Sequence, residues 1–460
     1  MADTRAKELV KQADKMFGAS AARNSLWQEI AENFYPERAD FTRPRDQSEE
    51  FADHLFGSYP VMARRELANM FSSMLRPRAV NWFSLHSSDE KIDADREARA
   101  YLEYLDGVQR RAMYDSAAQF VTTTRMADHD FAAFGNAVIE VGLNSRRDTL
   151  LYRAHHIRDC VWSENADGEV DVLYHKWCPS VRQLVQLYPK TASAETQRKA
   201  KDDPEAKVDC YRMAVPERLY KREGKPGQRS TAFTVVYVEK QSETVLEEVS
   251  EPWFRFVVPR WHQEPGTPYA HSPATSIILP DARTFQVVVR TLREAGEMAV
   301  NPPMASVVDA FRSDAQFYPG GLTAIDIEFA KDLGGVENTF SPSYGRGASG
   351  GERRPGFEIA GALRDDIRLG FFLDKIRLPD INTKTMTAYE FQQRMKEHIR
   401  QSVPLFEPIV DQYNAPLCDI TFRILQSVGA FGPARDMPKI LDRENVEFKI
   451  RSPLYEAEGQ

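Results

Sequence analysis

The stretch SIILPDARTFQVVVRTLREAGEMAVNPP, residues 276–303, says most about the fold. Its apolar and charged residues recur with helical spacing and predict one long helix over residues 276–299. Proline suits the first turn of a helix, so we interpret Pro280 as the opening signal of this helix and Asn301-Pro302-Pro303 as its end. A second amphipathic helix is predicted over residues 363–378. Residues 302–355 are expected to form a compact mixed insert with a flexible glycine-rich loop, residues 345–351.

Both predicted helices carry charges of both signs, among them Arg283, Arg290, Arg293, Glu294 and Glu297 on the first and Arg364, Asp365, Asp366, Arg368, Asp374, Lys375 and Arg377 on the second. A lone pair of such helices buries little apolar surface. The pair becomes stable if copies pack side by side, and a head-to-tail contact whose rotation closes generates a ring. A monomeric stalk, or a hairpin lying on the body of the protein, is an equally good interpretation at this point.

The chain before residue 276 divides into a helical part and a β-rich part. Helices are predicted over residues 6–34 with a break near Gly18, from Pro60 to Leu75, over 93–113 and over 116–134. Strands are predicted over residues 81–85, 137–141, 150–154, 160–163, 170–177, 208–214, 232–239 and 253–258, and short helices over 180–188 and 193–203. Asn165-Ala166-Asp167-Gly168 is a strong turn signal, and residues 221–230 form a basic loop. Trp27, Phe34, Trp82 and Phe83 are expected in the core.

The C-terminal third ends in a long broken helix. A polar loop, residues 379–386, leads into a helical pattern over 387–428 that begins with the capping box Thr387-Ala388-Tyr389-Glu390. Pro404, Pro408 and Pro416 lie within this pattern, so we expect kinks or breaks. The combination of helices and strands places the chain in the α+β class.

The composition is that of a folded protein. The 460 residues suggest about three domains, and 42% are hydrophobic. A net charge of −8 argues against a simple DNA-binding module, which should be basic. No apolar run is long enough to span a membrane, and residues 1–10 do not resemble a signal peptide. The four cysteines, Cys160, Cys178, Cys210 and Cys418, are widely spaced and are expected to be reduced thiols in the core.

Catalytic and metal-binding patterns are missing. The sequence contains no P-loop, no HExxH and no GxSxG motif. His155 and His156 are adjacent on a predicted strand and should point to opposite faces, which favours hydrogen bonding over metal binding. Asp365 and Asp366 are expected on a solvated helix face, and residues 345–347 (GRG) are a weak phosphate-binding signal. We expect no enzymatic activity, no cofactor and no metal.

Eight short stretches occur in an order known from one family. They are residues 27–36 (WQEIAENFYP), 75–85 (LRP and WFSL), 134–137 (FGNA), 260–274 (RW and YAHSPA), 279–284 (LPDART), 301–303 (NPP), 319–321 (PGG) and 387–390 (TAYE). In these stretches the chain resembles the portal, or head-to-tail connector, proteins of short-tailed bacteriophages. Ala270 replaces the family's usual glycine, and the chain stops near Leu454, where relatives usually continue into a crown.

The resemblance implies a ring, usually of twelve subunits, at one capsid vertex. By position, the wing comprises residues 1–270, the first stem helix 271–300, the clip 301–356, the second stem helix 357–378, the tunnel loop 379–386 and the long kinked wing helix 387–429; residues 430–460 begin a crown or are a truncated C-terminus. The implied partners are double-stranded DNA passing through the channel, the terminase large subunit, tail adaptors and the capsid and scaffolding proteins. No membrane partner is implied, and assembly would take place in the host cytoplasm, with the ring ending up in the virion.

The resemblance also suggests candidate sites. In the tunnel loop, Asp380, Asn382, Thr383 and Lys384 are expected to face DNA, although Lys384 could instead pair with Asp380. In the clip, Arg346, Arg353 and Arg354 are candidates for contact with terminase or adaptor, or form part of a solvated loop. In the stem, Arg283, Arg290, Glu294, Arg364, Asp366 and Arg368 are expected at packing positions. An acidic wall would let DNA slide without sticking, and sparse cations would brake it.

Two other functions remain as alternatives. One is a DNA-processing enzyme whose site has no recognisable motif, which ATPase and nuclease assays would detect. The other is a different head-completion protein, such as an adaptor or an ejected core protein. Adaptors are typically much shorter chains, and the helix–insert–helix order favours the portal.

Overall fold

The computed structural model describes residues 4–43, 50–78, 81–87, 92, 95–219, 232–300, 304–305, 341–342, 354–376, 407–432, 438 and 446–450. The chain divides into two compact units. The larger contains residues 1–52, 61–277 and 369–460, and the smaller contains residues 53–60 and 278–368. The predicted mixture of helices and strands is confirmed.

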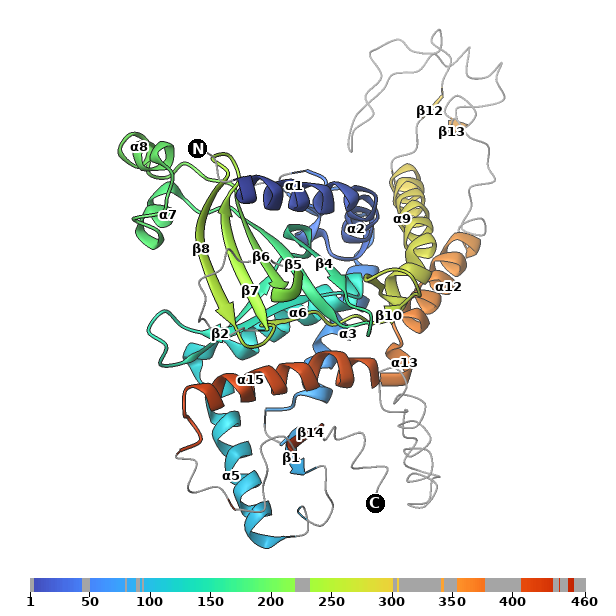
Figure 1. Ribbon diagram of the computed structural model, residues 1–460. Coiled ribbons are helices and arrows are strands. Elements are labelled where there is room, and N and C mark those ends of the chain that lie inside the picture. Colours follow the sequence, from blue (N-terminus) through green and yellow to red (C-terminus); the bar gives the residue numbers. More distant parts are fainter. Residues whose placement is uncertain are drawn as a thin grey trace, which may run out of the picture. The chain divides into compact units, whose positions relative to one another are not determined.

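The larger unit is built on a five-stranded antiparallel sheet in the order β4-β5-β6-β7-β8 (Figure 1). Its strands are β4 (Cys160–Glu164), β5 (Val170–Trp177), β6 (Cys210–Pro216), β7 (Phe233–Glu239) and β8 (Thr244–Glu251). The predicted turn lies between β4 and β5, where Gly168 adopts a φ of 80° and the Asn165 side chain accepts a hydrogen bond from the Asp167 amide at 2.8 Å. The edge strand β8 was not predicted, because its acidic residues interrupt the apolar pattern.

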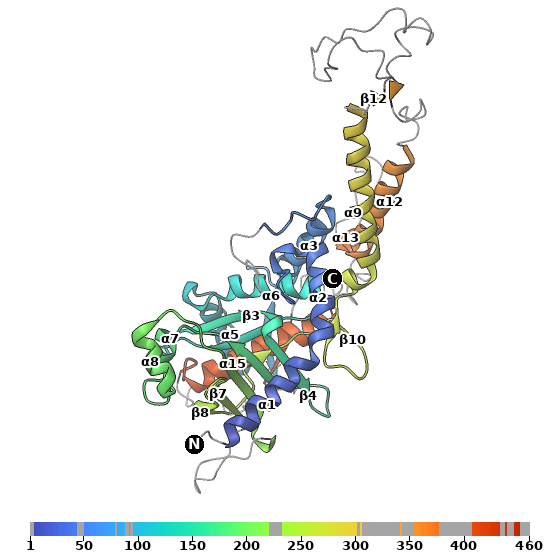
Figure 2. The same ribbon diagram turned by 90° about the horizontal axis from the view of Figure 1, so that it is seen from above.

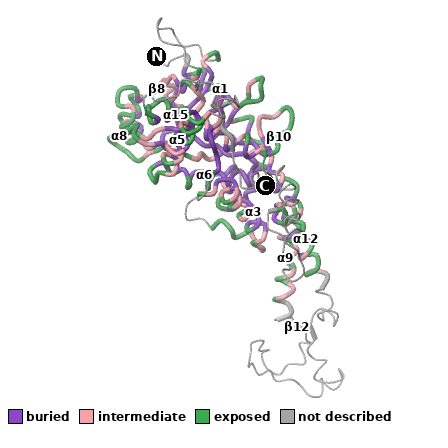
Figure 3. Tube along the Cα trace, turned by 90° about the horizontal axis from the view of Figure 1, so that it is seen from below, coloured by how far each residue is buried: buried purple, intermediate pink, exposed green. Residues whose placement is uncertain are grey.

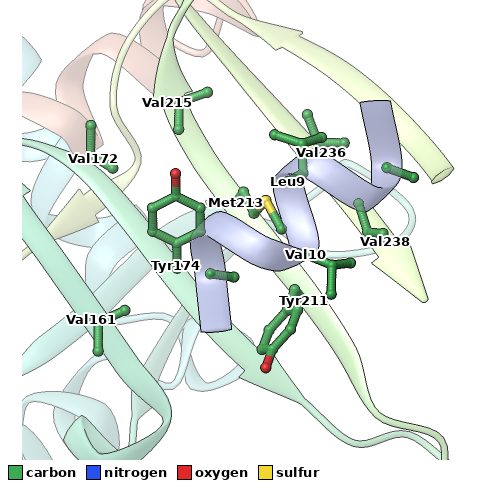
Figure 4. Close-up of a cluster of buried hydrophobic side chains, with 12 residues drawn as sticks. Leu9, Val10, Val161, Val172, Tyr174, Tyr211, Met213, Val215, Val236 and Val238 are labelled. Carbon is green, nitrogen blue, oxygen red and sulfur yellow. The ribbon is translucent and has the colours of Figure 1, made fainter. Parts of the chain in front are cut away.

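Helix α1 (Thr4–Ala19) covers one face of this sheet, as Figure 2 shows. Its buried residues recur every three or four positions, so they form one stripe that packs on the strands (Figure 4). The cluster contains Ala6, Leu9, Val10 and Ala13 from α1 and Val161, Val172, Tyr174, Tyr211, Met213, Val215, Val236 and Val238 from the sheet. The predicted break near Gly18 is confirmed, since α1 ends at Ala19 and α2 (Ala21–Phe34) follows.

Two short helices pack on the opposite face of the sheet. Helix α7 (Val181–Leu187) begins with a capping box between Ser180 and Gln183, and α8 (Ala194–Asp202) begins at Ser193, whose hydroxyl accepts from the Thr196 amide. Val181 and Leu184 of α7 contact Cys210 and Leu246 of the sheet.

A second sheet, in the order β3-β2-β9, joins the first through buried polar groups. Its strands are β2 (Val138–Leu143), β3 (Leu150–His155) and β9 (Phe256–Val257). Glu140 on β2 accepts two hydrogen bonds from Arg212 on β6, both of 2.7 Å, and one contact of 3.0 Å from His155. His156 contacts Asp40 instead, so the predicted divergence of the adjacent histidines is confirmed.

The helices that the structure describes in the larger unit contain two π-helical turns. Helix α3 (Tyr59–Met70) runs into the first, Phe71–Leu75, and the second, Val410–Asn414, precedes α15 (Ala415–Ser427). Pro416 comes just after the second π-helical turn, and the chain remains helical from residue 407 through 427, so no break occurs at Pro416; residues 387–406 lie outside the described ranges. Buried Arg76 connects the two turns because it pairs with Asp128 and donates to Asn414 at 2.8 Å.

The helix predicted over residues 116–134 needs correction. Residues Ser116–Ala118 form a 3-10 turn, Gln119 follows with a φ of 56°, and α6 spans Phe120–Phe134. The preceding helix agrees well with its prediction, since α5 covers Arg96–Met113 with Asp95 as its N-cap.

One pairing joins distant parts of the chain. Strand β1 (Phe83–Ser87) begins two residues later than predicted and pairs with β14 (Val446–Ile450), a strand that the sequence did not indicate. The four predicted core aromatics, Trp27, Phe34, Trp82 and Phe83, are all buried. Cys160, Cys210 and Cys418 are buried thiols as expected, but Cys178 is exposed.

The two long helices differ from their predicted limits. Helix α9 spans Pro273–Val300, so Pro280 lies inside it and not at its start. Helix α12 spans Arg354–Gly370, nine residues earlier than predicted, and Phe372 with a φ of 57° separates it from α13 (Leu373–Ile376). The described strands of the insert are β12 (Met304–Ala305) and β13 (Ser341–Pro342).

Candidate functional site

Helices α9 and α12 form an antiparallel hairpin and lie side by side in both views (Figures 1 and 2). Arg364 of α12 lies over the ring of Phe285 of α9, 5.7 Å from its centroid. Farther along, a Cβ atom on Gly356 would lie only 2.7 Å from Leu292, so glycine permits the close approach there. From the first contact to the second, the residue number rises on α9 and falls on α12, so the two helices are antiparallel.

A short segment before α3 is fastened to α9. The side-chain oxygen of Gln286 accepts hydrogen bonds from the amides of Phe56 and Gly57 at 2.9 and 2.8 Å. Its side-chain nitrogen donates to the Gly57 carbonyl at 2.8 Å. One glutamine thus satisfies three backbone groups of residues 53–60, which explains why this segment belongs to the smaller unit.

The six predicted stem residues lie on the hairpin, and two ion pairs that involve them each run within one helix. Arg290 pairs with Glu294 at 2.8 Å, and Arg368 contacts Asp365 at 3.6 Å. Arg283, Arg290, Glu294, Arg364 and Asp366 are exposed, whereas Arg368 is half-buried. The exposure of Asp365 and Asp366 confirms the predicted solvated face. Pairs with this exposure contribute less than about 1 kcal/mol each, so their charges shape the surface more than they stabilise it.

Large apolar side chains are also exposed on the hairpin. Figure 3 shows that much of α9 and α12 is intermediate or exposed. The exposed fractions are 64% for Val287 on α9 and 63%, 51% and 57% for Phe357, Ile359 and Leu369 on α12. Phe357 and Ile359 are two positions apart on α12 and so face different sides of the helix, as expected if the hairpin has a neighbour on each side.

The remaining predicted contact residues cannot be placed. Asp380, Asn382, Thr383 and Lys384 of the tunnel loop lie outside the described residues, as do Arg346 and Arg353 of the clip. Arg354 is the first residue of α12 and therefore begins the helix that leaves the insert.

The motif at residues 134–137 has a structural role that could not be inferred from the sequence. Gly135 ends α6 with a φ of 70°, and a Cβ atom there would lie 2.3 Å from the backbone carbon of His271. The Asn136 side chain donates to the Ala270 carbonyl at 2.6 Å and accepts from its amide at 3.0 Å. Ala270 lies in strand β11 (Ala270–His271), so its methyl group is tolerated in place of glycine.

This contact places the beginning of α9. Ser272 donates from its hydroxyl to the Ala132 carbonyl at 2.8 Å, and Thr275 donates to the Ala133 carbonyl at 2.6 Å. Two motifs more than 120 residues apart in the sequence therefore pack together, and they set where the first long helix starts.

The described residues were also compared with what a metal site or a membrane-spanning helix requires. No group of three or more histidine, cysteine, aspartate or glutamate side chains gathers among them as a metal site would require. No helix described is long and apolar enough to cross a membrane.

Comparisons with known proteins agree with the motif order. The family model for the bacteriophage head to tail connecting protein matches residues 6–459. The probable portal protein of Bordetella phage BPP-1 is 25% identical over 439 residues, which is 92% of this chain and 75% of that protein. The portal protein of Salmonella phage epsilon15 is 22% identical over 433 residues, with the same coverage of 92% and 75%.

Two solved structures are also similar. A chain from the virion of a native gene transfer agent particle matches with a TM-score of 0.36 and 11% identity, covering 88% of this chain and 82% of that one. A chain from the neck of an empty gene transfer agent particle matches with a TM-score of 0.36 and 10% identity, covering 87% of each.

Proposed function

The chain belongs to the family of bacteriophage head-to-tail connecting proteins, and we propose that its copies form a portal ring at one capsid vertex. The resemblance predicted from the eight sequence motifs is confirmed by this family match. The chain is thus a structural connector of the phage neck. In our proposal the ring admits double-stranded DNA during packaging, releases it during ejection, and has no catalytic activity of its own.

The exposed apolar side chains of the α9–α12 hairpin carry the proposal of a ring. Phe357 and Ile359 lie near the start of α12, and Val287 lies on α9. Burying a side chain such as Phe or Ile stabilises an assembly by about 1.5–3 kcal/mol. A hairpin placed beside the next copy would cover these groups on every subunit, and a repeated head-to-tail contact closes into a ring.

The proposal also covers the number of copies, the tunnel loop and the clip. We propose twelve copies, a tunnel loop at residues 379–386 with Lys384 facing DNA, and a clip at residues 301–356 whose Arg346, Arg353 and Arg354 meet terminase and then the tail adaptor. Capsid and scaffolding proteins would surround the wing. The net charge of −8 supports a channel through which phosphates slide with little binding.

Native mass spectrometry and negative-stain imaging test the ring. The wild-type protein, alone or with its capsid and scaffolding proteins, should give a ring of about a dozen copies with a central hole. The variant F357D/I359D should remain monomeric because charges replace the apolar contact. Glu358 lies between the two and is exposed, so Glu358→Gln serves as the matched control and should assemble. A monomeric wild-type protein under all these conditions, or a normal ring from F357D/I359D, would contradict the proposal.

A further inference from the structure

A cavity of about 460 Å³ lies along one face of α5, outside the helical hairpin. It is lined by Arg78, Asn81, Glu103, Gly107, Arg110, Arg111 and Tyr114. A second cavity of about 180 Å³ adjoins it, because Arg78 and Tyr114 line both. Glu103, Gly107, Arg110 and Arg111 of α5 are three, four or one positions apart, so they lie on one side of the helix and form a continuous wall of the cavity. Figure 1 shows where α5 lies.

Arg110 fixes the opposite wall of this cavity. Its guanidinium donates to the Asn81 side-chain oxygen at 3.0 Å and to the Arg78 carbonyl at 2.6 Å. These are neutral acceptors, so the positive charge of Arg110 is not matched by a carboxylate there. The bonds hold the segment carrying Arg78 against α5 and thereby set the width of the cavity.

Arg78 and Arg111 present the remaining donors. Arg111 uses its Nε atom for the Gly107 carbonyl at 3.1 Å, which leaves its two terminal nitrogens for a ligand. Arg78 lies over Tyr114, 6.0 Å from the ring centroid. Within the described residues neither arginine forms an ion pair with a carboxylate, and three arginines face a single glutamate, Glu103.

The helix end alone does not account for this cluster. Arg110 and Arg111 lie in the last turn of α5, where cations are favoured by the helix macrodipole. Arg78 comes from a different segment and faces the same cavity, so the convergence of the three needs another explanation. A concave site lined by guanidinium groups, an aromatic ring and a glycine has the features of a small binding site.

We propose that this cavity binds an acidic polypeptide segment of a partner protein, with its carboxylates on Arg78 and Arg111. Guanidinium groups bind carboxylates through paired hydrogen bonds, and Tyr114 and Gly107 offer a surface for the chain between them. A DNA duplex presents its phosphates on a broad convex surface, which fits a concave site of this size poorly. The inference does not depend on the proposed ring.

The test uses a fluorescein-labelled hexaglutamate peptide and the full-length protein. Fluorescence anisotropy should show binding that weakens as salt is raised. The variant R78A/R111A should bind at least about tenfold more weakly, since two charge-assisted contacts are lost. The matched control R96A/R125A removes the same charge from exposed positions outside both cavities and should bind as the wild type does.

A further variant separates loss of a contact from loss of structure. Glu103→Gln removes the only carboxylate among the described residues that line the cavity and should tighten binding, a gain that misfolding cannot produce. Three results would overturn the proposal. The first is that R96A/R125A loses binding as much as R78A/R111A does. The second is that duplex DNA or inorganic phosphate displaces the labelled peptide at a lower concentration than unlabelled hexaglutamate. The third is that R78A/R111A alone no longer oligomerises, which would assign the site to a neighbouring copy.

Discussion

Glu140 and Arg212 form a buried, doubly hydrogen-bonded ion pair between two different sheets, with both N···O distances at 2.7 Å. Burial acts to raise the pKa of Glu140, but the adjacent Arg212 guanidinium and the hydrogen bond from His155 hold that pKa well below its usual range. The pair therefore stays ionised and fixes β2 of the smaller sheet relative to β6 of the larger one.

Removing one partner of this pair should be costly. Glu140→Gln leaves the Arg212 charge buried without its hydrogen-bonded counter-charge, and the free energy of unfolding should fall by about 3–5 kcal/mol. The double variant E140M/R212M replaces both groups with apolar side chains and should recover most of that loss. Urea unfolding followed by circular dichroism measures both. Equal destabilisation of the single and double variants would show that packing, and not charge, dominates at this position.

Gly135 should tolerate no side chain. Gly135→Ala places a methyl group against the backbone of His271 at a φ of 70°, so we expect a loss of more than about 3 kcal/mol. Gly168 is the matched control, because its φ is 80° but no atom lies within 4 Å of the added methyl group. Gly168→Ala should lower the free energy of unfolding by only about 1–2 kcal/mol, which is the cost of a positive φ for alanine without any steric clash. Thermal unfolding of the two variants compares them directly, and similar losses in both would refute the role of the contact.

Stability should decrease in mild acid. Burial lowers the pKa of His175 to about 3, and the neighbouring His155 and Arg212 act in the same direction. Between that value and the ordinary pKa of about 6.5 the unfolded chain binds a proton that the folded chain does not, so the free energy of unfolding falls as the pH falls. His129 adds to this decrease, because burial and then Arg64 lower its pKa to about 4.

A substitution isolates the contribution of His175. His175→Phe should reduce the slope of unfolding free energy against pH by up to about one proton between pH 4 and pH 6. His262 is exposed, and His262→Gln should leave the slope unchanged. Urea titrations across this pH range provide the measurement. An unchanged slope in His175→Phe would mean that this histidine titrates normally in the folded protein.

Gln286 should control the mobility of the segment before α3. Gln286→Ala removes the acceptor for the Phe56 and Gly57 amides, so their hydrogen exchange should accelerate by about tenfold, equivalent to one lost hydrogen bond of typical strength. Thr284 lies nearby on α9, and its hydroxyl bonds only to the carbonyl of Pro280 in the same helix. Thr284→Ala should leave exchange in residues 53–60 unaltered, and acceleration by both variants would point to general loosening of α9.

The parts of the fold that depend on neighbouring residues are predicted well from the sequence. The turn at Asn165–Gly168 and the caps at Ser180 and Ser193 depend on residues within four positions of one another, so their patterns are visible in the chain. The predicted start of α9 is wrong, because Pro280 lies inside the helix and does not open it. Ser272 followed by Pro273 is the better opening signal, since the Ser272 hydroxyl accepts from the Thr275 amide at 3.5 Å.

Contacts between distant segments could not be predicted in the same way. Arg76, Asp128 and Asn414 meet although they are far apart in sequence, and nothing near any of the three in the chain indicates this contact. In the sequence the FGNA motif indicates only a family resemblance, whereas its close contact with residues 270–272 depends on the three-dimensional structure. The exposure of apolar residues on α12 is likewise not visible in the sequence, because the residues that cover a helix face depend on how the helix packs.

The pairing of β1 with β14 has a consequence for how the protein is made. When the ribosome has synthesised Phe83–Ser87, the partner strand Val446–Ile450 still lies about 360 residues ahead. At about 5–20 residues per second this strand waits for tens of seconds with its hydrogen-bonding groups unpaired. An unpaired strand is an open template for joining another chain. Nascent chains on one messenger RNA are therefore at risk of premature association until each has been translated almost to its end, and a chaperone that covers residues 83–87 would raise the yield of correctly folded subunits.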